Sequence, residues 1–340
     1  MVVQTRSKCS IDREDVSPTR SFDDQWESGE KATSSHMASG TIESPKSDVF
    51  QSVKAPAYVI ITPARNEAAL IERTLRSVID QTIRPAQWVI VDDGSADQTG
   101  AILDRYSAEF SWISVLHRQD RGFCDEYVGT IETILAGYGS VAVPDWEFLG
   151  FLDADIELAP TYFERCLAEF RDDPRLGIGG GELSELSSGV WKAQRLPRGH
   201  VRGATKIYRR ACWDANGLTP IPGYDTYDEI KAHYLGWYTR SFPNIPALHL
   251  RPAGAAWGSW RDAVKNGHMD YFLGYHPVFM AAKCVRRLVA RPYFINSLGH
   301  LWGYLRGYAK RRPQVADPMV IAFLRKQQLR RLLFLEDSFR

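Results

Sequence analysis

Hydrophobic and polar positions alternate in blocks from about residue 56 to residue 176. Short apolar runs that end at Ile61, Val91 and Leu152 predict buried strands. Between them, apolar residues recur every three or four positions, which predicts helices with one buried face. The recurring residues are Ile71, Leu75, Val78, Ile79, Ile102, Leu103, Tyr106, Phe110, Val128, Ile131, Ile134, Leu135, Phe163, Leu167 and Phe170. Strands that alternate with helices predict an α/β fold with a mostly parallel central sheet flanked by helices.

Local signals add detail to this pattern. Ser95 to Gln98 has the form of a capping box, which predicts a helix start at Ser95. The run 112–116 predicts a further strand, and Pro160 predicts the start of the next helix. The glycine-rich run 177–181 predicts a strand that another backbone or a ligand approaches closely. It does not match the dinucleotide fingerprint, because Glu182 occupies the last glycine position.

The two ends of the chain differ from the middle. Residues 1–55 are polar and lack an apolar period, so they predict a disordered leader. Residues 56–255 form the predicted catalytic domain, and residues 256–340 form a predicted helical, basic extension. This extension includes predicted helices at 278–289 and 319–335. Its charge-free run 292–305 has 14 residues, whereas a membrane-spanning helix needs roughly 20. We therefore expect no transmembrane span.

Composition changes the picture at one point, the distribution of charge. The chain is 44% hydrophobic and 24% charged, as expected for a globular enzyme. Residues 283–340 hold 13 Lys/Arg and 3 Asp/Glu, so a basic extension follows an acidic body. This asymmetry favours an anionic partner, either a membrane surface or nucleic acid. No nucleic-acid motif accompanies it, so we expect no nucleic acid.

The cysteines and the basic helix bear on location. The five cysteines are scattered and form no C-x-x-C pair, which is typical of reduced thiols in the cytoplasm. In the predicted helix 278–289, Lys283, Arg286 and Arg287 share one face and apolar residues lie largely opposite. Two interpretations remain open here. The helix lies in a membrane interface, or it packs on the catalytic domain with a solvated basic edge.

Acidic residues follow the predicted strands and supply the candidate chemistry. Asp153 and Asp155 come directly after an apolar run, and side chains two apart on an extended segment point to the same side. Together they could hold one hard cation. The alternative is an Asp-rich turn. Asp92 and Asp93 end the preceding predicted strand and could accept hydrogen bonds from a nucleobase or ribose. At this edge of a sheet such groups favour a nucleotide and metal site.

Three motifs in this order carry a resemblance to a known family. The segments Thr62–Glu67 (TPARNE), Val91–Ser95 (VDDGS) and Leu152–Asp155 (LDAD) resemble those of the inverting family-2 glycosyltransferases. The resemblance covers about residues 56–252. It implies the GT-A nucleotide-diphospho-sugar fold and transfer of a sugar to an acceptor hydroxyl with inversion. The stretch 257–303 also resembles a subgroup associated with bacterial surface polysaccharides.

The same resemblance implies roles at matching positions. The implied donor-binding residues are Pro63, Ala64, Glu67, Asp92, Asp93, Arg121 and Asp153. Arg118 and Arg121 lie where relatives have a basic loop that could neutralise the diphosphate, although solvated surface is the competing interpretation. The implied ligands of a divalent metal, Mn²⁺ or Mg²⁺, are Asp153, Asp155 and His249. A lone His is also commonly structural. Asn66 and Glu67 could instead cap their helix.

The family's general base is an Asp at the start of a helix that ends near a Gly-aromatic pair. Counting back from Gly236 places this base at Asp225. Tyr224 precedes it where the family usually has Glu, and this departure leaves Asp228 and Glu229 as rivals. Asp225 could also serve only as an N-cap.

The sequence therefore predicts a metal-dependent inverting glycosyltransferase that uses a nucleotide-diphosphate sugar donor and a glycan or lipid-linked acceptor. We expect it in the cytoplasm, peripherally bound to the inner face of the plasma membrane. The alternatives are a catalytically silent nucleotide-binding scaffold at the membrane surface, a sugar-nucleotidyltransferase and a two-carboxylate glycosidase. A nucleotidyltransferase would need a glycine-rich loop after its first strand, which Thr62–Glu67 lacks.

Overall fold

The computed structural model of the chain describes residues 56–122, 128–187, 190–194, 199–251, 259–288 and 294–333. The leader expected at residues 1–55 lies outside this part. The predicted domain boundary at residue 255 also lies outside the described residues.

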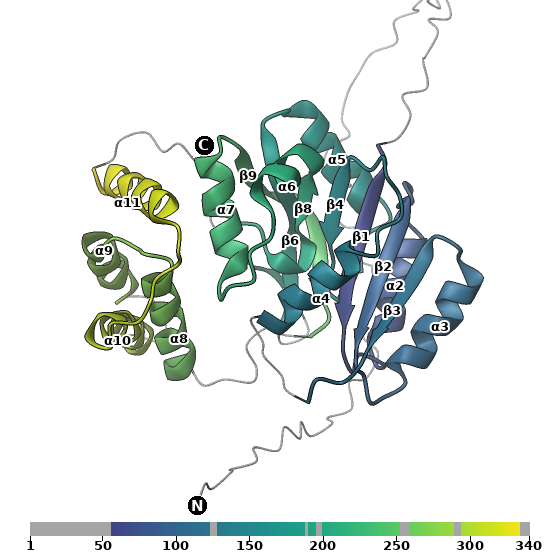
Figure 1. Cartoon of the computed structure of the whole chain (residues 1–340), viewed down its shortest axis with the longest axis horizontal. Coiled ribbons are helices and arrows are strands. Elements are labelled where there is room, and N and C mark those ends of the chain that lie inside the picture. The colour runs from purple at the N-terminus through teal and green to yellow at the C-terminus, as the bar shows by residue number, and fades with distance from the viewer. Residues whose placement is uncertain are drawn as a thin grey trace, which may run out of the picture. The chain divides into compact units, whose positions relative to one another are not determined.

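The described residues contain one nine-stranded mixed sheet (Figure 1). Its strands are β1 (Tyr58–Ala64), β2 (Gln87–Asp93), β3 (Ile113–Arg118), β4 (Phe148–Phe151), β5 (Ile156–Leu158), β6 (Leu176–Ser187), β7 (Val190–Ala193), β8 (Ile207–Arg209) and β9 (Tyr238–His249). The order across the sheet is β3-β2-β1-β4-β8-β6-β9-β5, with β7 paired to β6. The sequence-based α/β prediction is confirmed by this architecture.

The parallel arrangement holds over four neighbouring strands. β2 pairs with both β1 and β3, and β4 pairs with β1, all in parallel. Beyond β4 the sheet becomes mixed, because β8 runs antiparallel to both β4 and β6. β5 is also antiparallel to β9, whereas β6 and β9 are parallel. The "mostly parallel" description therefore applies to the half of the sheet that contains β1.

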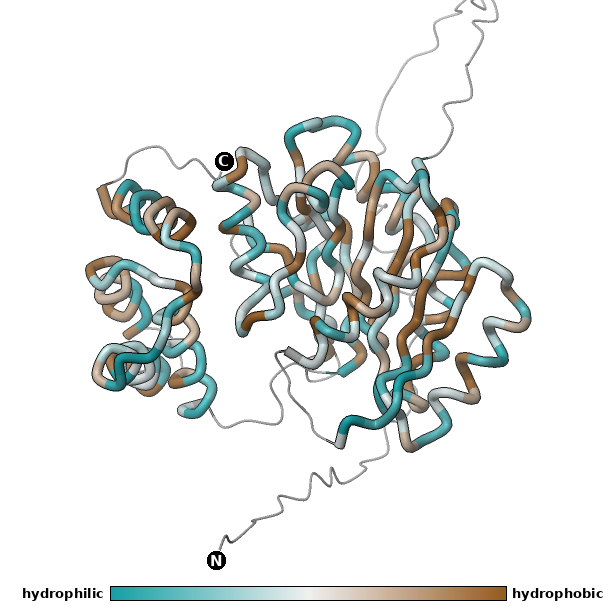
Figure 2. The backbone as a smooth tube through the Cα atoms, in the orientation of Figure 1, coloured by the Kyte–Doolittle hydropathy of each residue, from teal (hydrophilic) through white to brown (hydrophobic). Residues whose placement is uncertain are grey.

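Two apolar clusters cover the two faces of the sheet, as the alternation along β1 shows. Tyr58 and Ile60 belong to one cluster, and Val59 and Ile61 belong to the other. The first cluster includes residues of α2 (Ile71–Ile79), α3 (Thr99–Glu109) and α5 (Tyr162–Asp172). The second includes residues of α4 (Val128–Tyr138), α6 (Arg210–Asn216) and α7 (Tyr224–Tyr234). Figure 2 shows the hydrophobic residues concentrated along the central strands.

The glycine-rich strand is approached closely by backbone on both sides. A Cβ added at Gly180 would collide with the carbonyl oxygen of Thr205, and one at Gly181 with that of Ile245. Thr205 belongs to the short 3₁₀ helix η1 (Gly203–Thr205) and Ile245 to β9. The predicted close approach is confirmed, and its partners are backbone atoms.

Four helices follow the sheet: α8 (Ser259–Phe272), α9 (Pro277–Arg287), α10 (Ile295–Ala309) and α11 (Pro318–Leu332). The predicted helices at 278–289 and 319–335 correspond to α9 and α11, and residues 334 and 335 lie outside the described part. Within the described ranges, no helix combines the length and apolar character that crossing a bilayer requires. Cys166, Cys212 and Cys284 are free thiols in buried positions.

One local prediction was wrong. α3 begins at Thr99 with Gln98 as its N-cap, so Ser95 does not cap it. Ser95 instead accepts a hydrogen bond from the backbone N–H of Asn66 at 3.0 Å, and Asn66 Oδ1 accepts one from Ala96 at 2.8 Å. These contacts join the loops after β1 and β2, and a contact between distant loops has no signature in a local capping pattern.

Candidate functional site

The carboxyl ends of β1, β2 and β4 meet at one edge of the sheet. These strands are parallel neighbours, and their register pairs Ala64 with Asp92 and Ile61 with Phe151. Most of the predicted site residues follow these ends, so the structure brings the loops that carry them to the same edge. This is the position at which open α/β sheets bind ligands.

Three separate segments hold the Asp153-Ala154-Asp155 turn. The Asp153 N–H donates to the carbonyl of Ala204 at 3.0 Å, and the Thr74 hydroxyl donates to the carbonyl of Ala154 at 2.8 Å. The N–H of Leu250 donates to the carbonyl of Asp155 at 2.9 Å. With its backbone held by η1, α2 and the end of β9, the turn presents its two carboxylates in fixed positions.

The two carboxylates repel each other. Burial, followed by the charge of Asp155, raises the pKa of Asp153 to about 7, while His249 acts in the opposite direction. His249 Nε2 lies 3.4 Å from Asp155 Oδ2, and its Nδ1 lies 3.6 Å from Glu185 Oε1. Burial opposes protonation of His249, but the hydrogen bond and charge of Asp155 leave its pKa raised. The site therefore favours added positive charge.

Asp153, Asp155 and His249 are side chains of the kind that bind a divalent cation, in a site where substrate phosphates would supply further ligands. No group of three or more His, Cys, Asp or Glu residues within the described ranges forms a closed cation cage. Mg²⁺ and similar ions are commonly held by one or two carboxylates together with substrate phosphates, and Asp153 and Asp155 supply such a pair. His249 Nδ1 is buried without a hydrogen-bond partner, so its ring is not locked in place on that side.

Glu67 occupies the loop after β1 and faces the same region. It pairs with Arg251 through two contacts of 3.0 and 2.7 Å. Burial raises its pKa, Arg251 lowers it, and Asp155 raises it, which places Glu67 within electrostatic reach of the Asp pair. The N-cap of α2 is Leu70, so neither Asn66 nor Glu67 caps this helix. Pro63 and Ala64 end β1 directly before this loop.

Asp92 is held by contacts that organise its own loop. Its Oδ1 accepts the N–H of Ser95 at 3.0 Å, and its Oδ2 lies 3.0 Å from His117 Nδ1. The other ring nitrogen of His117 lies 2.9 Å from Asp104 Oδ1. Hydrogen bonds to Asp104 and then to Asp92 raise the pKa of His117. Sequence reasoning missed His117, which has no motif of its own.

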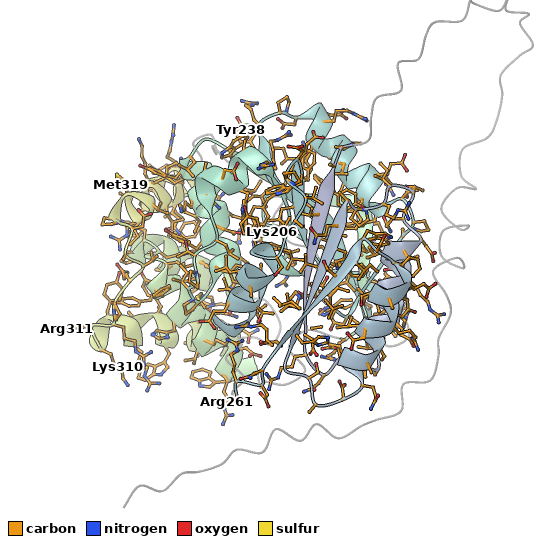
Figure 3. The ribbon with its side chains drawn as sticks, turned by 45° about the vertical axis from the view of Figure 1, so that its right-hand side comes forward. Lys206, Tyr238, Arg261, Lys310, Arg311 and Met319 are labelled. Atoms are coloured by element: carbon orange, nitrogen blue, oxygen red, sulfur yellow. The ribbon has the colours of Figure 1, made fainter. Side chains whose placement is uncertain are left out.

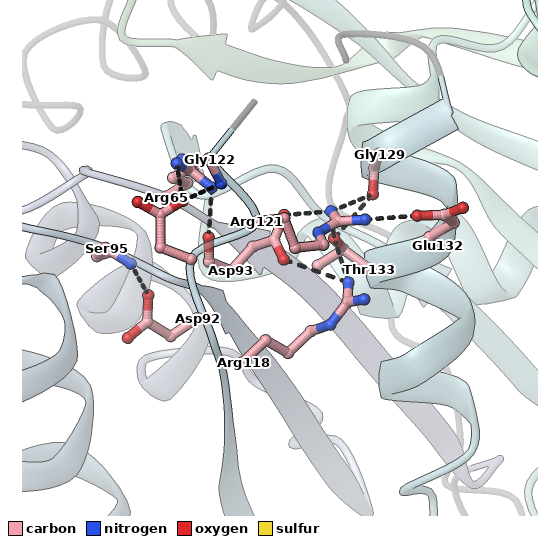
Figure 4. Close-up of polar contacts among 11 residues, drawn as sticks. Arg65, Asp92, Asp93, Ser95, Arg118, Arg121, Gly122, Gly129, Glu132 and Thr133 are labelled. Atoms are coloured by element: carbon pink, nitrogen blue, oxygen red, sulfur yellow. Dashed lines mark hydrogen bonds and ion pairs between the residues drawn. The ribbon is translucent and has the colours of Figure 1, made fainter. Parts of the chain in front are cut away.

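Asp93 is paired with both arginines that the sequence placed in a basic loop (Figure 4). Arg121 Nη2 lies 2.6 Å from Asp93 Oδ2, and Arg118 Nη1 lies 3.2 Å from Oδ1. Arg121 also pairs with Glu132. The guanidinium groups of both arginines therefore contact Asp93 at the end of β2, and neither is simply a solvated surface residue.

Asp225, Asp228 and Glu229 have different surroundings, although they lie close together on α7. Asp228 is buried, with Oδ1 3.0 Å from Lys206 Nζ, and Oδ2 accepts the hydroxyl of Tyr208. Glu229 accepts from the N–H of Val201 at 2.8 Å and lies 3.2 Å from Lys206 Nζ.

Lys206 is completely buried at the centre of this cluster (Figure 3). Its pKa is raised by Asp228 and Glu229 against the opposing effect of burial. Its ammonium group also donates to the carbonyl of Asp225 at 2.6 Å. Sequence reasoning missed Lys206, because a single buried lysine between η1 and β8 gives no periodic signal.

Asp225 lies in the first turn of α7, is partly buried, and borders the Asp153 turn through η1. A Cβ added at Gly203 in η1 would lie 3.9 Å from Asp225 Cβ and 2.9 Å from the Tyr224 hydroxyl. The carbonyl of the next η1 residue, Ala204, accepts the hydrogen bond from the Asp153 N–H. The N-cap of α7 is Gly223, so Asp225 does not serve as its N-cap.

Tyr224, the residue that departs from the family pattern, lies at the centre of this region. Burial raises its pKa strongly, followed by the charges of Asp153, Asp225 and Asp228. Its side chain therefore lies within electrostatic reach of both the metal-site carboxylate and the candidate base.

The fold and site define a class of α/β protein whose candidate ligand site lies at the carboxyl edge of the sheet, with a carboxylate pair suited to a cation. Residues 59–214 match the sequence profile described as glycosyl transferase family 2. This part of the chain is a family-2 glycosyltransferase domain, and its α/β architecture is the GT-A fold.

Known proteins agree with this assignment. EpsH of Bacillus subtilis (strain 168), named as a glycosyltransferase, is 25% identical over 223 residues, which cover 58% of this chain and 62% of EpsH. The chondroitin synthase of Escherichia coli is 31% identical over 120 residues, covering 35% of this chain and 16% of that protein. The chain thus spans less than two thirds of the length of either relative.

A solved structure shares the fold. The crystal structure of GalNAc-T7 with UDP, GalNAc and Mn²⁺ superposes with a TM-score of 0.55 at 15% identity. The match covers 83% of this chain and 58% of that one. At this level of identity the similarity concerns the fold.

Proposed function

We propose that the protein is a metal-dependent inverting glycosyltransferase that moves a sugar from a nucleoside-diphosphate donor to an acceptor hydroxyl. The observation that carries this proposal is the Asp153–Asp155 pair, held at the end of β4 and bordered through η1 by Asp225. GalNAc-T7, which shares this fold, was solved with UDP and Mn²⁺, and this supports a nucleotide donor and a cation.

The donor would lie along the carboxyl ends of β1, β2 and β4. Pro63, Ala64 and Glu67 would line the nucleoside pocket, with Asp92 or Asp93 contacting the base or ribose. Arg121, which pairs with Asp93, would also bind the donor. Asp153 and Asp155 would hold Mn²⁺ or Mg²⁺, with His249 as a further ligand. The bound cation would stabilise the charge that develops on the departing nucleoside diphosphate.

Asp225 is the proposed general base. Its carboxylate would take the proton from the acceptor hydroxyl as that oxygen bonds to the anomeric carbon. The carbon's bond to the nucleoside diphosphate breaks on the opposite face, so the configuration inverts. Asp228 and Glu229 are weaker candidates, because their oxygens already contact Lys206 and other buried donors. Lys206 and Gly223 instead position the first turn of α7.

The acceptor is proposed to be a growing glycan or a lipid-linked glycan. The similarity to a chondroitin synthase supports a polysaccharide acceptor. We place the enzyme in the cytoplasm, peripherally attached to the inner face of the plasma membrane.

Thermal stabilisation by a panel of nucleoside diphosphates, with and without Mn²⁺ or Mg²⁺, tests the donor site. We expect one diphosphate to raise the melting temperature in a metal-dependent way, and Asp155→Ala to abolish this response. No response from the wild-type protein to any nucleotide would remove the proposal. Stabilisation without transfer to any acceptor would favour the silent scaffold, and pyrophosphate exchange would favour a nucleotidyltransferase.

Asp225→Asn tests the base. General-base assistance is worth about 10²–10⁴ in rate, so turnover should fall by about that factor while nucleotide stabilisation persists. Asp214→Asn is the matched control, since Asp214 is exposed on α6 and only its pairing with Arg210 would change. Near-normal turnover in Asp225→Asn would reassign the base to Asp228 or Glu229.

A further inference from the structure

The C-terminal helix α10 has an unusual distribution of large and small residues. Its exposed large apolar side chains are Ile295, Leu298, Trp302 and Leu305, which are 45%, 53%, 56% and 51% accessible. Their spacing of three, four and three residues places them on one face of the helix. We call these four residues the α10 stripe. A helix in a water-soluble protein normally buries such a stripe against the core.

The buried face of α10 is formed mainly by small residues. A Cβ added at Gly303 would collide with the carbonyl of Val264 on α8, and one at Gly307 with the ring of Tyr271. At Gly299 it would lie 2.8 Å from Ala263 Cβ. The backbones of α8 and α10 thus pack closely through glycines, while the four stripe side chains face outward and His300 and Tyr304 are buried. Close packing through small residues is typical of helices in contact with lipid.

A cationic pocket lies beside the stripe. It has a volume of about 460 Å³ and is formed by α8, α10 and the segment that follows α10. Its lining includes Arg261, Lys265, Arg306 and Arg312, and also the indoles of Trp260 and Trp302. Trp302 belongs to both the pocket and the stripe, so the two features are continuous. Figure 3 labels Arg261 on α8 and, directly after the end of α10, Lys310 and Arg311.

Four cationic side chains line this pocket, namely Arg261, Lys265, Arg306 and Arg312. In the described part of the chain, the side chains of Arg261, Arg306 and Arg312 take part in no ion pair. Burial lowers the pKa of His268 in the pocket wall, and Arg312 and Arg306 lower it further. The sequence from Lys283 to Ala316 contains no Asp or Glu. A ligand that fits this environment carries negative charge.

Geometry and charge together favour one occupant. An anionic bilayer offers phosphates to the pocket and acyl chains to the stripe at once. Its interface is also where Trp side chains are enriched. A second copy of the chain, docked through the same face, would bring two sets of uncompensated arginines together. Isologous pairing of that kind is opposed by charge.

We propose that the pocket between α8 and α10 binds the phosphate group of an anionic phospholipid while the α10 stripe inserts among the acyl chains. This lipid site would supply the membrane attachment that forms part of the proposed function. It does not depend on the donor site. Lys283 and Arg287 of α9 have a different role, because Lys283 Nζ pairs with the buried Asp270 at 2.5 Å and Arg287 contacts His300 at 3.2 Å.

Flotation of the full chain with vesicles tests this site. We expect binding to phosphatidylcholine vesicles that contain phosphatidylglycerol, and little binding to phosphatidylcholine alone. The binding should weaken with added salt. Each cation near an anionic surface contributes enough for roughly a fivefold change, so Arg306→Gln/Arg312→Gln should bind about 25-fold more weakly. Arg171→Gln, on the exposed side of α5, is the matched control.

A second double variant, Leu298→Ser/Leu305→Ser, tests the stripe and should reduce flotation at unchanged pocket charge. Metal-dependent nucleotide stabilisation, measured on every variant, reports folding and the donor site separately from lipid binding. Absence of flotation at low salt, or equal flotation by the pocket variant and wild type, would overturn the proposal. The proposal would also be overturned if the wild type bound no vesicles but formed a dimer that the stripe variant had lost. Inorganic phosphate that stabilises the protein as well as vesicles do would show a free-phosphate site instead.

Discussion

His117 joins two carboxylates that belong to different elements, and this makes its charge important. Its ring nitrogens contact Asp92 at the end of β2 and Asp104 in α3. The ring is about half exposed, so solvent screens these contacts and the contribution of the bridge is modest. The contacts nevertheless keep the carboxyl end of β2 attached to α3.

The pH dependence of stability should reveal this bridge. The pKa of His117 is raised above its ordinary value of about 6.5. The stabilisation is therefore fully present below about pH 6.5 and is lost as pH rises through the raised value. We expect the difference in melting temperature between wild type and His117→Gln to be larger at about pH 6 than at about pH 9. An equal difference at both pH values would contradict the charged bridge.

At the scale of single residues, the sequence could locate the acidic groups but not their partners. Asp92, Asp153 and Asp155 were found because each follows an apolar run. Arg251 was not predicted to pair with Glu67, which lies 184 positions earlier in the chain. Lys206 was missed for the same reason, because its acidic partners come from a separate helix. Only the folded chain brings such partners together.

At the scale of elements, the α8–α10 pair depends on glycine. The three glycines of its contact surface, Gly299, Gly303 and Gly307, recur every four residues and let the helix backbones approach. Glycine in a helix interior costs about 1 kcal/mol relative to alanine, so replacing one with alanine would normally stabilise α10. Here the collision with α8 opposes that gain.

Gly303→Ala decides between these two effects. The added methyl group would collide with a backbone carbonyl of α8, which cannot rotate away as a side chain can. We expect the free energy of unfolding to fall by about 1–3 kcal/mol, measured by urea denaturation. Gly139→Ala is the control, since its nearest neighbour would be 3.5 Å away and the substitution is expected to be near neutral. A stabilised Gly303→Ala protein would show that the helices are not in close contact.

Element prediction succeeded where a period extended over several residues. The amphipathic helices and the three strands that precede the acidic groups were located in this way. The antiparallel half of the sheet was not predicted, because β5 and β8 contain three residues each. Three residues carry no measurable period, and strand direction depends on pairing with distant segments.

At the scale of the whole molecule, the C-terminal helices brace the helix that carries the proposed base. Tyr227 and Ile230 of α7 pack in one cluster with Val320 and Leu324 of α11. The Tyr227 hydroxyl donates to Asp317 Oδ2 at 3.1 Å, and Asp317 Oδ1 accepts the N–H of Val320 at 3.1 Å. Asp317 thus caps α11 and also attaches it to α7.

A double-mutant cycle with Tyr227→Phe and Asp317→Ala should detect this connection. We expect a coupling free energy of about 0.5–1.5 kcal/mol, since one hydrogen bond is shared. Asp317→Ala alone should cost about 1 kcal/mol more than Tyr227→Phe, because it also removes the cap. Unfolding by urea measures all four corners of the cycle, and additive effects would mean that the two helices are independent.

The glycines of α10 also have a consequence for the order in which the chain folds. Three interior glycines in a helix of 15 residues lower its intrinsic stability by about 3 kcal/mol in total. An isolated helix of this length is already marginal in water. A peptide spanning residues 294–310 should therefore show almost no helical circular dichroism alone. During synthesis, α10 would form only after α8 is available to pack against, so a helix with four large exposed apolar side chains is also one that cannot assemble early.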